Sequence, residues 1–141
     1  MKQRIITLLS LLFITPLGFL CKFYSGVGAK WLNDSFGGLL YEIFWCLVVF
    51  LILPKFKPIN IAIGVFIVTC VLEIMQLWHP PFLELTRSNF IGRTVIGTSF
   101  VWSDFIYYVL GSTLGWLWLA SIRKINEQRR GKTTERTEST E

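Results

Sequence analysis

The chain has 141 residues, of which 52% are hydrophobic and 16% are charged, and its mean hydropathy is +0.54. This composition excludes an ordinary soluble domain, and the length allows one domain only. The formal net charge is +5, but the basic residues flank apolar runs. The sequence therefore predicts contact with a lipid bilayer and no nucleic-acid binding.

The long apolar runs predict membrane-spanning α-helices, because backbone polar groups inside a bilayer must be satisfied within the chain. The first run covers residues 5–21, after Lys2 and Arg4. As a helix it would rise about 26 Å, just enough to cross a bilayer core, and Pro16 should kink or weaken it. A cleaved signal peptide is the alternative, but its small-residue site at 27–29 lies far beyond the run.

Two further spanning helices are expected in the middle of the chain. A loop over residues 22–35 leads to the second apolar run, at 36–53. A turn over 54–58 with two lysines separates it from the third run, at 59–78. The sequence His79–Pro81 ends the third run, since proline lacks a backbone donor and the residue before it disfavours the helical region.

The remaining sequence predicts an outer loop, a fourth helix and a charged tail. The loop over residues 79–99 carries many apolar side chains, so we expect it to lie on or dip into the membrane interface. The fourth run covers 100–122. The rest, 123–141, is rich in charge and predicts a disordered tail or at most a short basic helix. The expected organisation is a four-helix membrane domain at 1–122 and a cytoplasmic tail at 123–141.

The Lys and Arg residues are unevenly divided between the two sides of the predicted bundle. Ten of them lie in the N-terminus, the turn at 54–58 and the tail, whereas four lie in the first and third loops. Because basic residues favour the cytoplasm, both termini should be inside and these two loops outside. The sequence thus predicts an all-α integral membrane protein with four transmembrane helices, N-in and C-in.

Three carboxylates interrupt the apolar runs, namely Glu42, Glu73 and Asp104. A charge at the centre of a spanning helix costs about 2.5–3.5 kcal/mol on insertion scales, and such residues usually face the bundle interior. The predicted topology places all three near the outer boundary. Gln76 shares a helix face with Glu73, and Tyr108 shares one with Asp104. The expected outward-facing binding site comprises Glu42, Glu73, Gln76, Arg87, Asp104 and Tyr108.

Each of these acids also has an alternative explanation. Asp104 lies near a helix start, where an acid interacts favourably with the helix dipole. Glu73 could pair with Arg87 to hold the third loop in place. Glu42 has no basic residue within a helical turn, so it would be a neutral acid or have a partner on another helix. The three acids together could also suit a hard divalent cation.

Other motifs add packing information but no recognised chemistry. Gly111 and Gly115 lie one turn apart in the fourth run and predict close helix packing, either within the chain or between copies in a homo-oligomer. The sequence contains no glycine-rich phosphate loop and no recognised Ser/His/Asp set, and His79 is the single histidine, which excludes paired-histidine zinc sites. We therefore expect no cofactor and no metal, and the sequence assigns no catalytic residue.

Several of these residues occur in an order that resembles a known family. Gly37 stands five residues before Glu42, Glu73 precedes Gln76 by three, and the stretch Ile96-Gly97-Thr98-Ser99-Phe100-Val101-Trp102-Ser103-Asp104 is followed by Tyr108 and Gly111. Over about residues 5–120, this pattern resembles the bacterial membrane family called domain of unknown function 2809. That family usually has Gly-Asp where this chain has Tyr41-Glu42. The order of polar residues is more loosely similar to VanZ-like proteins of the bacterial envelope.

The resemblance implies a multi-pass protein of the bacterial cell membrane and brings no assigned reaction. We expect an envelope-associated binding or accessory protein whose outer site holds a lipid or cell-wall precursor headgroup. One alternative is a membrane-embedded enzyme acting on a headgroup or an isoprenoid-linked substrate, with the acids as acid, base or metal ligand. The other is a small transporter or channel subunit.

Overall fold

A computed structural model describes residues 2–77, 80–96 and 102–140, and within these ranges the chain is helical and has no strand. The elements in order are α1 (Lys2–Phe23), α2 (Ala29–Trp31), the π-helix η1 (Leu32–Phe36), α3 (Gly37–Ile52), α4 (Pro58–Met75), α5 (Pro81–Arg87), α6 (Phe90–Ile96) and α7 (Asp104–Glu138). Over the described ranges, α1, the continuous stretch Ala29–Ile52, α4 and α7 are long and apolar enough to cross a membrane. This confirms the prediction of an all-helical protein with four such helices.

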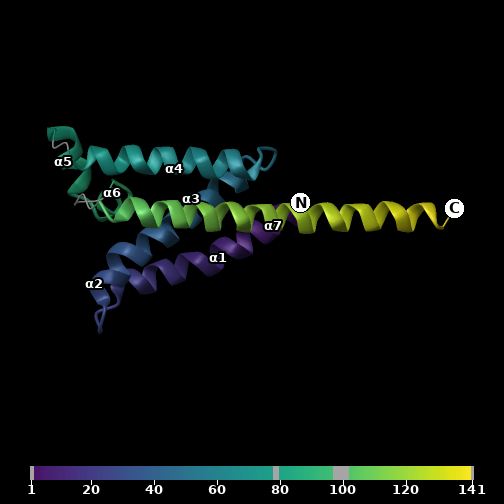
Figure 1. The fold of residues 1–141 in the computed structure, drawn as a ribbon, viewed down its shortest axis with the longest axis horizontal. Helices are drawn as coiled ribbons and strands as arrows, with labels where there is room; N and C mark the ends of the chain where they lie inside the picture. Colours follow the sequence, from purple (N-terminus) through teal and green to yellow (C-terminus); the bar gives the residue numbers. More distant parts are fainter. Residues whose placement is uncertain (1, 78–79, 97–101, 141) are drawn as a thin grey trace.

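The long helices pack around a central pair, α3 and α7 (Figure 1). Both α1 and α4 contact each member of this pair, and in Figure 1 they lie on opposite sides of α7. The core between the helices includes Leu47, Phe50 and Leu119, whose side chains are fully buried. Large apolar side chains also cover the outside, for example Leu12 at 73% exposure. Such an apolar exterior suits a surface covered by lipid.

Helix boundaries differ from the predicted apolar runs around the first and third loops. Helical structure begins at Ala29, inside the predicted first loop, directly after Gly28, whose φ of 75° is a conformation that glycine adopts without strain. The helix α4 ends at Met75, three residues before the predicted end. The third loop folds into α5 and α6, and Pro81 occupies the first turn of α5, where its missing N–H costs nothing.

The helix α7 continues past the predicted membrane boundary into the charged tail and projects beyond the other helices (Figure 1). The sequence predicts disorder or a short basic helix for this segment. Its side chains are exposed from Glu127 to Thr140, so tertiary packing does not support the helix there. Local interactions do: Arg123 Nε donates to Glu127 Oε1 at 3.3 Å, one turn along the helix.

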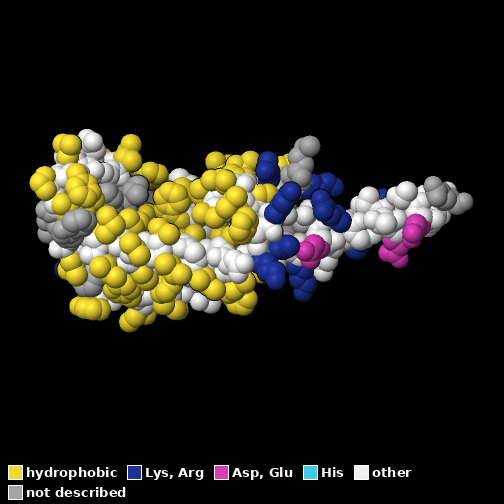
Figure 2. Space-filling model, turned by 90° about the horizontal axis from the view of Figure 1, so that it is seen from above, with side chains coloured by type: hydrophobic (Ala, Val, Ile, Leu, Met, Phe, Trp, Pro, Cys, Tyr) yellow, Lys and Arg dark blue, Asp and Glu magenta, His cyan; other side chains and the backbone are white. Residues whose placement is uncertain are grey.

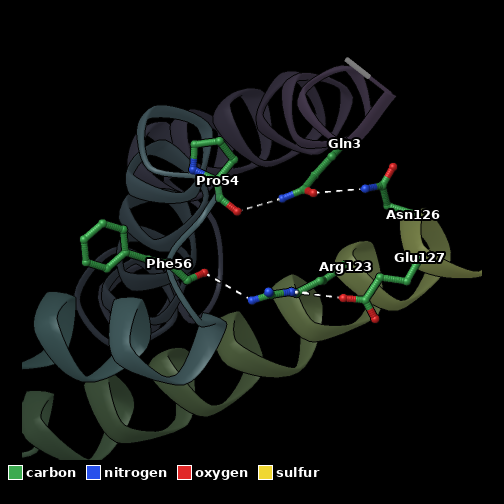
Figure 3. Close-up of polar contacts among 6 residues, drawn as sticks. All are labelled: Gln3, Pro54, Phe56, Arg123, Asn126 and Glu127. Atoms are coloured by element: carbon green, nitrogen blue, oxygen red, sulfur yellow. Dashed lines mark hydrogen bonds and ion pairs between the residues drawn. The ribbon is translucent and has the colours of Figure 1, made fainter. Parts of the chain in front are cut away.

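Polar contacts join the N-terminus, the turn after α3 and α7 at one end of the bundle (Figure 3). Gln3 Nε2 donates to Pro54 O at 3.3 Å, and Asn126 Nδ2 donates to Gln3 Oε1 at 3.2 Å. Arg123 Nη1 donates to Phe56 O at 3.5 Å. Figure 2 shows Lys and Arg gathered between the apolar body and the projecting tail. We call this the basic end, defined by Lys2, Arg4, Lys55, Lys57, Arg123 and Lys124, and we call the end with α2, α5 and α6 the loop end.

Candidate functional site

Glu42 is the most deeply buried acid near the loop end. It lies on α3 with 0% of its surface exposed. Ser112 Oγ of α7 donates to Glu42 Oε1 at 2.6 Å, whereas Glu42 Oε2 has no hydrogen-bond partner among the described residues. Thr69 of α4 lies near this carboxyl group but donates its hydroxyl to Val65 O at 2.8 Å. One buried acceptor of Glu42 is therefore left open.

Glu73 connects α4 to α7. It is 1% exposed, and its Oε2 accepts hydrogen bonds from Gln76 Nε2 at 2.8 Å and from Tyr108 Oη at 2.9 Å. Gln76 follows Glu73 by three residues, so both side chains lie on one face of the C-terminal part of α4. The amide oxygen of Gln76 is also buried without a partner among the described residues.

Three glycines let α3 and α7 approach closely beside these acids. A Cβ added at Gly111 would lie 2.8 Å from both Glu42 Cβ and Leu39 O, and one added at Gly115 would lie 3.0 Å from Cys46 Sγ. On α3, a Cβ at Gly38 would lie 3.3 Å from the Tyr108 ring. Gly111 and Gly115 thus pack within one chain, against α3.

Arg87 and Asp104 lie at the edge of the cluster. Arg87 on α5 is 7% exposed, and it donates from Nη1 to Glu84 Oε1 at 3.1 Å and from Nη2 to Met75 O at 3.2 Å. The second contact binds α5 to the C-terminal end of α4, where helix carbonyls lack intrahelical partners. Arg87 therefore holds α5 against the end of α4 that carries Glu73 and Gln76.

Asp104 is the first residue of α7 and is partly buried. Ser103 precedes the helix, but its side chain makes no capping hydrogen bond. Asp104 Oδ1 is buried without a partner among the described residues, and Asp104 lies within electrostatic reach of Glu73. His79, which ends the third apolar run in the sequence, falls outside the described residues.

The structure thus brings Glu42, Glu73, Gln76, Asp104 and Tyr108 together with Ser112 into one buried cluster, which we call the polar cluster. Sequence reasoning missed Ser112. It follows Tyr108 by four residues and Asp104 by eight, so all three lie on one face of α7, and this spacing could have identified it. Within the described part of the chain, no three His, Cys, Asp or Glu side chains form a group able to hold a metal ion.

These features define a small all-helical protein with four candidate membrane spans and a buried polar cluster where α3, α4 and α7 meet. The model of the family described as "Protein of unknown function (DUF2809)" matches residues 27–112, more than half of the chain, and the chain belongs to this family. The match includes every residue of the polar cluster and leaves out α1 and the tail. Comparison with curated proteins and with solved structures gave no match. The looser similarity to VanZ-like proteins stays a prediction.

Proposed function

We propose that the protein is a binding or accessory protein of the bacterial cell envelope, whose polar cluster takes the headgroup of a lipid or cell-wall precursor. The observation that carries this proposal is Glu42 Oε2, a fully buried acceptor without a partner among the described residues. Leaving such a group unsatisfied costs about 1–3 kcal/mol, and more when it is charged. A ligand that donates a hydrogen bond to it would recover this free energy.

The buried oxygen atoms of the cluster that lack a hydrogen-bond partner among the described residues define the chemistry of the ligand. When the two carboxyl groups are ionised, Glu42 Oε2 and Asp104 Oδ1 are acceptors, as is Gln76 Oε1, so the complementary groups on the ligand are donors. An ammonium group or a set of hydroxyl groups fits this requirement, as found in amine-bearing phospholipids and in sugar-linked lipids. Arg87, at the edge, would be placed to meet the phosphate that links such a headgroup to its tail.

The topology proposed with this function places both termini in the cytoplasm and the polar cluster on the outer side of the membrane. The basic end groups the N-terminus, the turn after α3 and the start of the tail on one side of the bundle (Figure 2). Because basic residues favour the cytoplasm, the loop end would then face outward. There the cluster would meet headgroups of the outer leaflet.

The alternative of a transporter finds less support in the packing. Below the polar cluster, the described core between α3, α4 and α7 is filled by apolar side chains such as Cys46, Phe50 and Leu119. Ion or solute passage through a single chain would require these side chains to separate. The enzyme alternative lacks a specific observation in its favour, so binding is the function we propose.

The experiment compares Glu42→Gln with Glu135→Gln, the same substitution at an exposed position of the tail. Each variant is purified in mild detergent, and co-purifying lipids are identified by mass spectrometry. We expect wild type and Glu135→Gln to retain a lipid with an amine or sugar headgroup. Glu42→Gln should retain several-fold less of it, because the amide replaces one of the acceptors with a donor. Equal retention in all three proteins would contradict the proposed function.

A further inference from the structure

An apolar groove runs between α3 and α4, outside the polar cluster. Its volume is about 550 Å³, and its lining follows α4 from Asn60 to Leu72. That length corresponds to ~18 Å of helix, compared with ~15 Å for half of a bilayer core. Val68 in its wall is 59% exposed, so the groove opens sideways toward lipid. Its size and position therefore match a chain that enters from one leaflet.

The groove reaches the basic end of the bundle. Phe56, on the turn after α3, lines this end, and the exposed residues Lys55 and Lys57 flank it in sequence. Arg123 Nη1 donates to the Phe56 carbonyl at 3.5 Å, which brings a guanidinium group to the same turn (Figure 3). The turn from 53 to 60 contains no acidic residue. The apolar groove thus ends near Lys55, Lys57 and Arg123, and Arg123 also forms an ion pair with Glu127 at 3.3 Å.

We propose that the groove binds one anionic phospholipid of the leaflet at the basic end. An acyl chain would lie between α3 and α4, and the phosphate would lie at Lys55, Lys57 and Arg123. Charge complementarity supports this occupant, because basic residues at a membrane surface attract anionic headgroups. The proposal does not rest on the proposed function, because the phosphate would lie at the end of the bundle away from the polar cluster. The far end of the groove, at Tyr41, Thr69 and Leu72, adjoins Glu42 and Glu73.

Two variants of the full chain test the two halves of this site. In Gly64→Leu a side chain fills the groove, and a Cβ at Gly64 would meet nothing within 4 Å, so no clash is introduced. Its matched control is Gly18→Leu on α1, where a Cβ also meets nothing within 4 Å. The second variant, Lys55→Gln with Lys57→Gln, removes positive charge where the groove reaches the basic end. Its control, Lys132→Gln with Arg136→Gln, removes equal charge from the exposed tail.

The readout is native mass spectrometry of the protein in detergent, titrated with phosphatidylglycerol or phosphatidylcholine. We expect wild type and both controls to bind one phosphatidylglycerol in preference to phosphatidylcholine. Gly64→Leu should reduce binding of phosphatidylglycerol by on the order of tenfold, and the lysine pair should reduce the preference by a similar factor.

Three results would overturn the proposal. Wild type could show no preference for the anionic lipid, either variant could bind like its control, or both controls could lose as much as the variants. If the protein is a dimer that Gly64→Leu converts to a monomer without loss of phosphatidylglycerol, the groove is covered by a second copy instead. Loss of the amine- or sugar-bearing lipid from Glu42→Gln is measured in a separate experiment. Failure of one proposal can therefore be told apart from failure of the other.

Discussion

Glu42 and Glu73 are both almost completely buried, yet their oxygens have different surroundings. Glu73 Oε2 accepts hydrogen bonds from Gln76 and Tyr108 and so ties α4 to α7. Glu42 accepts one from Ser112, and its second oxygen has no partner among the described residues. We infer that Glu73 organises the cluster, whereas Glu42 supplies the acceptor that a ligand would use.

The Tyr108 hydroxyl can be tested by Tyr108→Phe, which removes the hydrogen bond to Glu73. We expect a loss of about 1–3 kcal/mol in the free energy of unfolding, because a buried acceptor loses a donor. The free energy of unfolding is measured in mixed detergent micelles, and the matched control is Tyr107→Phe on the same helix. The Tyr107 hydroxyl accepts a hydrogen bond from Trp31 at an exposed position, so Tyr107→Phe should lower the free energy of unfolding by less. Equal losses in the two variants would contradict this role for Tyr108.

At the level of residues, the sequence predicted the acids of the cluster because charged groups are rare in apolar runs. It did not predict Ser112 as the partner of Glu42, since serine is common in membrane helices and the pairing depends on how α7 is rotated against α3. The sequence also did not predict the hydrogen bond from Arg87 to Met75 O, because this contact requires α5 to fold back on α4.

At the level of helices, hydropathy alone predicted the four long segments, because length and apolarity are sufficient signals for a span. The helices α5 and α6 were not predicted, since seven residues give too few turns for a clear periodicity. The extent of α7 was also not predicted. Its tail has few apolar residues to signal a helix, and the helix there makes local contacts, among them the ion pair of Arg123 with Glu127.

The contact between α3 and α7 can be tested by Gly111→Ala. The new Cβ would lie 2.8 Å from the Leu39 carbonyl oxygen, which belongs to the backbone and cannot rotate away. We expect a loss of about 1–3 kcal/mol in the free energy of unfolding from overpacking. The control is Gly131→Ala on the same helix, where a Cβ meets nothing within 4 Å and alanine favours the helix. A stable Gly111→Ala variant would show that the helices do not approach this closely.

At the level of the whole molecule, the bundle has two chemically different ends. The basic end joins the N-terminus, the turn after α3 and the tail, and the opposite end holds the polar cluster beneath α5. This polarity underlies both proposals: a headgroup with donor groups at the polar cluster, and an anionic lipid at the basic end. The proposal that the polar cluster meets the outer leaflet depends on which end faces the cytoplasm.

Orientation is therefore the most direct test of the central claim that the polar cluster faces outward. Single cysteines are introduced at Ser88, exposed after α5, and at Ser139, exposed at the end of the tail, and intact cells are treated with a membrane-impermeant thiol reagent. The unmodified chain, with its native Cys21, Cys46 and Cys70, provides the background. We predict labelling of Ser88→Cys in intact cells and of Ser139→Cys only after permeabilisation. Labelling of Ser139→Cys in intact cells, with Ser88→Cys protected, would contradict it.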